Sequence, residues 1–70
     1  MPMFDPQLIE IMRSALQEVM TRVPSDLRTD AVKAHLAEFV LKAAAEGQTE
    51  YGQLVSAAAD QISVVLKLLA

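Results

Sequence analysis

The sequence lacks several residue types on which common protein chemistries depend. It has no cysteine, a single histidine, two glycines and three aromatic residues among 70. Without cysteine, disulfides and thiolate metal sites are excluded. One histidine is too few for a histidine-based metal centre, and two glycines are too few for a glycine-rich phosphate-binding loop. We therefore expect the chain to hold neither a metal nor a cofactor.

Long hydrophobic runs and an excess of basic charge are also missing. The most apolar stretch, 62–70, has nine residues and includes Lys67, whereas a helix needs about 20 to span a bilayer. The first six residues lack the basic and apolar regions of a signal peptide. These features predict a cytoplasmic protein with no membrane contact. Six basic against nine acidic side chains, a net charge of -3, disfavour nucleic-acid binding.

Apolar side chains at helical spacing are what the sequence has in abundance. Hydrophobic residues make up 53% of it, and their spacing predicts helices over 6–23, 29–46 and 50–69 within a single domain, 1–70. The three stripes are, in order, Leu8, Ile11, Met12, Ala15, Val19 and Val23; Val32, Leu36, Phe39, Val40 and Ala43; and Tyr51, Leu54, Val55, Ala58, Ile62, Val65, Leu66 and Leu69. The predicted fold class is all-α, as a three-helix bundle or a helical hairpin plus one helix.

Capping and turn residues mark the ends of these helices. Asp5 and Pro6 suit the start of the first helix, and Pro24 ends it. Thr29 is the predicted N-cap of the second helix, and Gly47 supplies the left-handed residue after its last turn. For the third helix we expect Thr49 as the N-cap.

The apolar faces are wider than three helices of this length need. At about 100° per residue the arcs cover roughly 180° on the first helix and 220° on the second, against a little over 100° for a surface helix. A chain this small without disulfides or a metal usually needs a second subunit or very good helix packing. We predict a homodimer with an interface at the arc edges: Ala37, Leu41, Val64 and Leu68. The alternative is a monomeric bundle, in which the eleven alanines account for the width of the arcs.

Candidate catalytic and metal-binding residues are few. His35 and Glu38, three residues apart, share one face of the second helix, but a stable metal site needs a third or fourth ligand. The competing interpretation is a solvent-facing His35, with Glu38 paired to Lys42. No serine lies in a glycine-framed nucleophile elbow. We predict that the protein is not an enzyme.

Two segments, 36–47 (LAEFVLKAAAEG) and 54–59 (LVSAAA), resemble small uncharacterised bacterial helical proteins. The resemblance implies a helical fold and carries no activity or site.

Protein–protein interaction is the function that the wide apolar faces favour, first of all between copies of this chain. A small dimeric nucleic-acid-associated regulator is one alternative. Arg22, Arg28 and Lys33 gather near the first connection, but the helix after Gly47 has no basic residue before Lys67. A binder of apolar small molecules, with a cavity between protomers, is the other alternative.

Overall fold

The computed structural model describes residues 5–69, which form four α-helices and one short 3₁₀ helix. The elements are α1 (Pro6–Thr21), η1 (Ser25–Leu27), α2 (Asp30–Ala45), α3 (Tyr51–Ala59) and α4 (Ile62–Leu69). No strand occurs between residues 5 and 69, and the predicted all-α class is confirmed.

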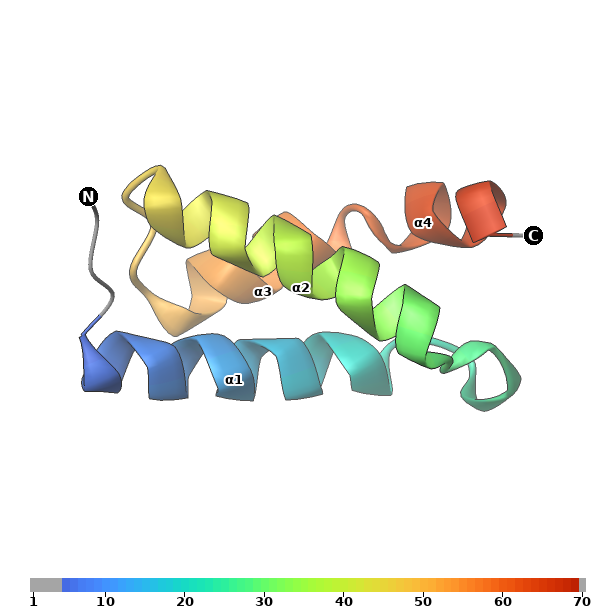
Figure 1. Ribbon diagram of the computed structural model, residues 1–70, viewed down its shortest axis with the longest axis horizontal. Helices are drawn as coiled ribbons and strands as arrows, with labels where there is room; N and C mark the ends of the chain where they lie inside the picture. Colours follow the sequence, from blue (N-terminus) through green and yellow to red (C-terminus); the bar gives the residue numbers. More distant parts are fainter. Residues whose placement is uncertain (1–4, 70) are drawn as a thin grey trace.

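The helices build an elongated molecule, 34 × 19 × 18 Å, around an antiparallel pair, α1 and α2 (Figure 1). Helix α3 packs against both members of this pair from one side, behind them in Figure 1. Helix α4 packs mainly on α2 and extends the molecule beyond α3. One side of the α1–α2 pair therefore carries α3, and the opposite side carries no helix of the described chain.

The starts of α1 and α2 follow the predicted capping. An Asp5 carboxylate oxygen accepts a hydrogen bond from the Leu8 amide at 2.7 Å, and the Thr29 hydroxyl accepts one from the Val32 amide at 3.2 Å. Each cap satisfies a backbone N–H that has no partner within its own helix.

Gly47 ends α2 in the predicted way, because its φ of 101° is one that residues with a side chain rarely adopt. Its amide donates to the carbonyl of Ala44 at 3.1 Å, and the amide of Gln48 donates to that of Ala43 at 3.0 Å. These two bonds form the Schellman pattern, which satisfies the last carbonyls of a helix and turns the chain out of it.

Helix α1 ends at Thr21, two residues before the predicted end at Val23. The amides of Arg22 and Val23 each reach back only three residues, to Val19 and Met20, at 3.0 and 3.2 Å. This tighter turn ends the α-helical ladder but keeps Val23 in the core, with 1% of its surface exposed.

The predicted helix over 50–69 is wrong, because the structure divides it into α3 and α4. At the break the Gln61 amide bonds to the carbonyl of Ala58, three residues back, at 3.0 Å. Asp60 keeps a helical conformation, φ -63° and ψ -18°, so the apolar spacing continues through the bend without a glycine or proline to mark it. The bend redirects the chain onto α2, where Val65 becomes buried.

The predicted N-cap at Thr49 is also wrong, because Glu50 holds that position, with an extended backbone at φ -91° and ψ 143°. Its amide donates to the side-chain oxygen of Gln53 at 3.4 Å. A polar side chain three residues into the helix therefore bonds back to the cap, as in one half of a capping box.

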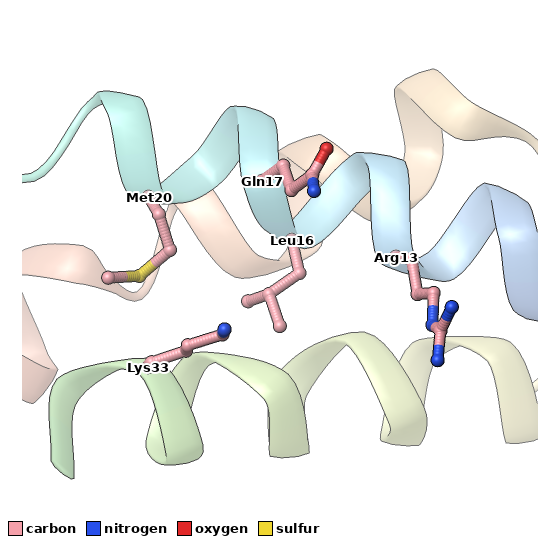
Figure 2. A pocket seen from close by; sticks show the side chains of 5 residues that line it. All are labelled: Arg13, Leu16, Gln17, Met20 and Lys33. Atoms are coloured by element: carbon pink, nitrogen blue, oxygen red, sulfur yellow. The ribbon is translucent and has the colours of Figure 1, made fainter. Parts of the chain in front are cut away.

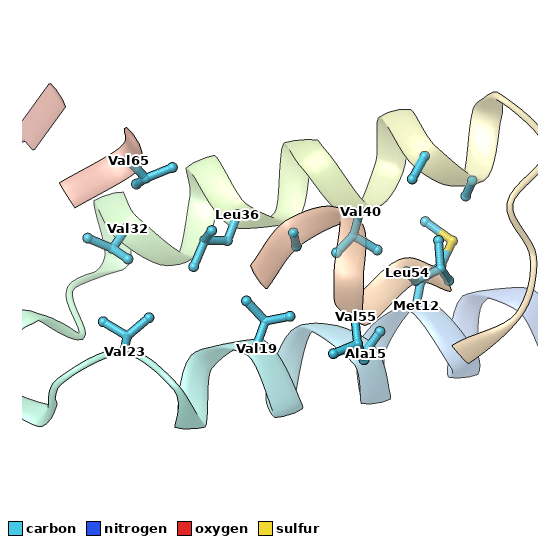
Figure 3. Packing of buried hydrophobic residues seen from close by; sticks show 13 residues of the cluster. Met12, Ala15, Val19, Val23, Val32, Leu36, Val40, Leu54, Val55 and Val65 are labelled. Carbon is cyan, nitrogen blue, oxygen red and sulfur yellow. The ribbon is translucent and has the colours of Figure 1, made fainter. Parts of the chain in front are cut away.

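The core runs along the length of the molecule (Figure 3). Its buried members are Met12, Ala15, Val19, Val23, Val32, Leu36, Val40, Ala43, Ala44, Leu54, Val55, Ala58 and Val65. Val23, Val32 and Val65 lie together at one end, where α4 meets α2, and Met12 and Leu54 lie together at the other (Figure 3). No polar or charged side chain of the described residues is buried.

Candidate interaction surface

The side of the α1–α2 pair opposite α3 is hollowed into a groove, which we call the α1–α2 groove. One section of about 310 Å³ is lined by Ile9, Met12, Arg13, Leu16, Ala37, Val40 and Leu41. A second section is lined by Arg13, Leu16, Gln17, Met20 and Lys33 (Figure 2). Arg13 and Leu16 line both sections, so the two sections form one continuous groove along α1 and α2.

Apolar side chains form most of this groove and remain in contact with solvent. Ile9 is 42% exposed and Leu41 is 47% exposed, while Leu16, Met20 and Ala37 are half-buried. Figure 2 shows Leu16 and Met20 directed from α1 toward α2, with Lys33 reaching back from α2. Full burial of a side chain such as leucine or isoleucine is worth about 1.5–3 kcal/mol. Covering the groove would therefore bury a sizeable apolar surface that the single chain leaves exposed.

Charged residues border the groove. In the first section Arg13 is the only polar lining residue. Its guanidinium lies 3.9 Å from the Glu10 carboxylate, and both side chains are about three-quarters exposed, at 75% and 73%. On α2, Glu38 is exposed beside Ala37 and one turn from Leu41, both of which line the groove. Each long edge of the groove thus carries charges of both signs: Arg13 with Glu10 on α1, and Lys33 with Glu38 on α2.

The four residues predicted for a dimer interface lie on two different features. Ala37 and Leu41 line the α1–α2 groove. Val64 and Leu68 lie on α4, 46% and 70% exposed, and line neither section of that groove. The sequence analysis missed the contribution of α1, namely Ile9, Leu16 and Met20. Their spacing along one edge of the α1 stripe is the signal that could have revealed it, because these positions face a neighbouring helix.

A second apolar groove lies where α4 meets the start of α2. It measures about 330 Å³ and is lined by Leu27, Thr29, Val32, Leu66, Lys67 and Leu69. Leu27 and Leu69 are 42% and 43% exposed. This groove is next to the C-terminal end of the described residues.

The described residues contain neither a cluster of metal ligands nor the ion pair predicted on α2. No group of three histidine or acidic side chains within residues 5–69 could hold a metal ion. His35 is half-buried rather than solvent-facing. The ion pairs among the described residues are Glu10–Arg13 and Glu18–Arg22, so the expected Glu38–Lys42 pair is wrong.

Within the described residues, none of the helices combines the length and the apolar character that crossing a membrane requires. Comparison of the chain with protein-family models, with curated proteins and with solved structures found no match.

Proposed function

We propose that this protein works through protein–protein contact, as a homodimer that forms through the α1–α2 groove. The main support for the proposal is that another helix covers the α1–α2 pair on one side only. Helix α3 packs against one side, and the other keeps Ile9, Leu16, Met20, Ala37 and Leu41 in contact with solvent. Contiguous exposed apolar surface of this kind is typical of interaction sites.

The contacts of the arginines make nucleic-acid binding a weaker candidate than protein–protein contact. Arg22 lies 3.3 Å from Glu18, Arg13 lies 3.9 Å from Glu10, and the Arg28 guanidinium donates to backbone carbonyls. These are all three arginines of a chain with a net charge of -3. A phosphate backbone would have to compete with these intramolecular partners.

A small apolar ligand is also a weaker candidate than a protein partner as the occupant of the α1–α2 groove. Ligand sites combine an apolar wall with several convergent polar groups that fix the orientation of the ligand. The more apolar section of the groove has Arg13 as its single polar lining residue, and the polar residues Gln17 and Lys33 line only the other section. A long, open, apolar face suits a helix surface better than an enclosed molecule.

Sedimentation velocity of the wild type and of two matched variants tests the proposal. The wild type should form particles of twice 7.6 kDa as its concentration rises through the micromolar range. Leu41→Glu places a charge in the groove and should leave a folded monomer. Leu68→Glu makes the same chemical change at a more exposed leucine outside the groove and should leave the dimer intact.

Two results contradict the proposal. One is a wild-type chain that stays at 7.6 kDa at the highest concentration measured. The other is a dimer that Leu68→Glu disrupts and Leu41→Glu does not, which would place the interface on α4. Far-UV circular dichroism of both variants shows whether each remains helical.

A further inference from the structure

We infer that the bend between α3 and α4 is a hinge through which two copies of this chain exchange their last helices. When the hinge straightens, α3 and α4 join into one helix, and α4 leaves the α2 on which it packs. It then packs on α2 of a second copy, whose own α4 packs on the first. This exchange uses a different surface from the α1–α2 groove and goes beyond the proposed function.

The residues of the hinge are compatible with a continuous helix. Residues 56–65 include neither glycine nor proline, and Asp60 has a helical backbone, with φ -63° and ψ -18°. The α-helical pattern, in which an amide donates four residues back, holds for Asp60 to Ser56 and for Val65 to Gln61, both at 3.0 Å. Between them, the amide of Gln61 donates only three residues back, to Ala58 at 3.0 Å. The interruption is therefore short and contains no residue that prevents a helix.

Straightening the hinge would add backbone hydrogen bonds. Residues 62–64 form the first turn of α4, where amides have no carbonyl partner within their own helix. In one joined helix the same amides would donate to the carbonyls of residues 58–60, four positions back. The eight residues of α4 would also become part of a longer helix, which holds its structure better than so short a segment does alone.

An isolated chain stays bent because straightening would uncover apolar surface. Val65 of α4 and Val32 of α2 are 1% and 3% exposed, and Figure 3 shows them together at one end of the core. Ile62 and Leu66 of α4 are partly buried against the same core. Losing this burial outweighs the added hydrogen bonds, because each of these replaces a bond to water and contributes little net free energy.

A second copy in the straight state restores the lost burial. The surface that α4 leaves on α2 is complementary to α4, and α4 of the second copy brings the same residues to it. The exchanged dimer therefore keeps the apolar contacts of two bent chains and adds hydrogen bonds at both hinges. Exchange of an identical element is a low-cost route to dimers for this reason, and a short hinge such as residues 60–61 promotes it.

Competition from the chain's own α4 sets the concentration at which exchange occurs. A contact made within one chain over a short connection has an effective concentration of about millimolar. Exchange should therefore become appreciable at roughly millimolar protein, above the micromolar range in which the groove dimer is tested. Variants in a Leu41→Glu background, which removes the groove contact, report on exchange alone.

Thiol cross-linking between two different chains tests the exchange, made clean by the absence of cysteine. Leu27 and Leu69 line the same groove between α4 and the start of α2. One Leu41→Glu chain carries Leu27→Cys and another carries Leu69→Cys, and their mixture is treated with a short bismaleimide. Exchange should give a mixed cross-linked dimer. In the matched control Val64→Cys replaces Leu69→Cys, because Val64 is as exposed, 46% against 43%, but lies outside this groove. Equal yields would overturn the exchange.

Hinge variants should shift the exchange in opposite directions, measured by sedimentation equilibrium. Asp60→Ala raises the helix propensity of the joined helix in both copies and should lower the dissociation constant about fivefold. Asp26→Ala removes the same charge at an exposed position outside the hinge and serves as its matched control. Ser63→Pro changes an exposed residue in the first turn of α4, where proline is tolerated, but interrupts the joined helix and should abolish exchange.

Two outcomes contradict the hinge. One is an Asp60→Ala chain that associates no more tightly than Asp26→Ala. The other is a Ser63→Pro chain that remains helical by circular dichroism and still exchanges as readily as the unmodified hinge. Neither outcome bears on the α1–α2 groove, because the Leu41→Glu background removes that contact.

Discussion

Arg28 shows how one side chain takes a role that its position in the sequence does not reveal. From the sequence it belongs to a group of basic residues near the first connection, with Arg22 and Lys33. In the structure its Nε donates to the carbonyl of Val23 at 2.8 Å, and its Nη2 donates to that of Thr21 at 3.2 Å. Cationic donors at the C-terminal end of a helix satisfy its free carbonyls and oppose its dipole. Arg28 thus holds the end of α1 to the loop that follows it.

Arg28→Ala should lower the free energy of unfolding by about 1 kcal/mol, the value of a charged hydrogen bond reduced for partial exposure. Urea denaturation followed by circular dichroism measures the change. Arg22→Ala is the matched control, because Arg22 makes only an exposed ion pair with Glu18 and should cost less than about 0.5 kcal/mol. Equal losses for the two variants would show that the carbonyl contacts of Arg28 add nothing to stability.

At the scale of elements, the C-terminal part of the chain depends on one short helix and its contact with α2. Helix α4 has eight residues, too few to be stable alone in water. Among its described residues only Val65 is buried, at 1% exposure, with Ile62 and Leu66 partly buried beside it. The bend at Asp60 and Gln61 is favoured because it lets Ile62, Val65 and Leu66 pack in the core. Local sequence gives no sign of the bend, since both segments have helical spacing.

Val65→Ala should release α4 from α2 and cost about 2 kcal/mol, because it removes buried methyl groups at a nearly closed site. Amide hydrogen exchange should speed up in α4 more than in α1 or α2. Val64→Ala is the neighbouring control: Val64 is 46% exposed, and its truncation should change stability by less than about 0.5 kcal/mol. Unchanged exchange in α4 after Val65→Ala would show that other contacts hold the helix.

At the scale of the whole molecule, the central feature is an apolar surplus that four helices do not cover. The width of the apolar arcs predicts such a surplus, and the structure shows exposed apolar residues in the α1–α2 groove and on α4. If the groove closes around a second copy, folding and association are linked, because the dimer then forms only from folded chains.

The thermal midpoint of unfolding should accordingly rise with protein concentration, by a few degrees for a hundredfold increase at roughly micromolar levels. Circular dichroism melts at a low and a high concentration measure this shift. Leu41→Glu should give a midpoint that does not change with concentration. A concentration-independent midpoint for the wild type would mean that the folded chain gains no stability from a second copy.

The sequence by itself determined the helical class, the starts of α1 and α2 and the glycine that ends α2. These features depend on residues within about four positions of one another: Asp5 with Leu8, Thr29 with Val32, and Gly47 with Ala44. Half of the predicted interface, Ala37 and Leu41, also lies in the α1–α2 groove, because the edge of an apolar arc can be read from helical spacing.

Only the tertiary structure decided which side of the α1–α2 pair α3 covers, where the last helix bends, and that Arg28 holds the end of α1. It also joined Ile9, Leu16 and Met20 to Ala37 and Leu41, and it left Val64 and Leu68 on a separate element. Each of these outcomes depends on contacts between segments far apart in the chain. Helical spacing shows how wide an apolar face is, but the packing of distant helices decides which part of that face remains open.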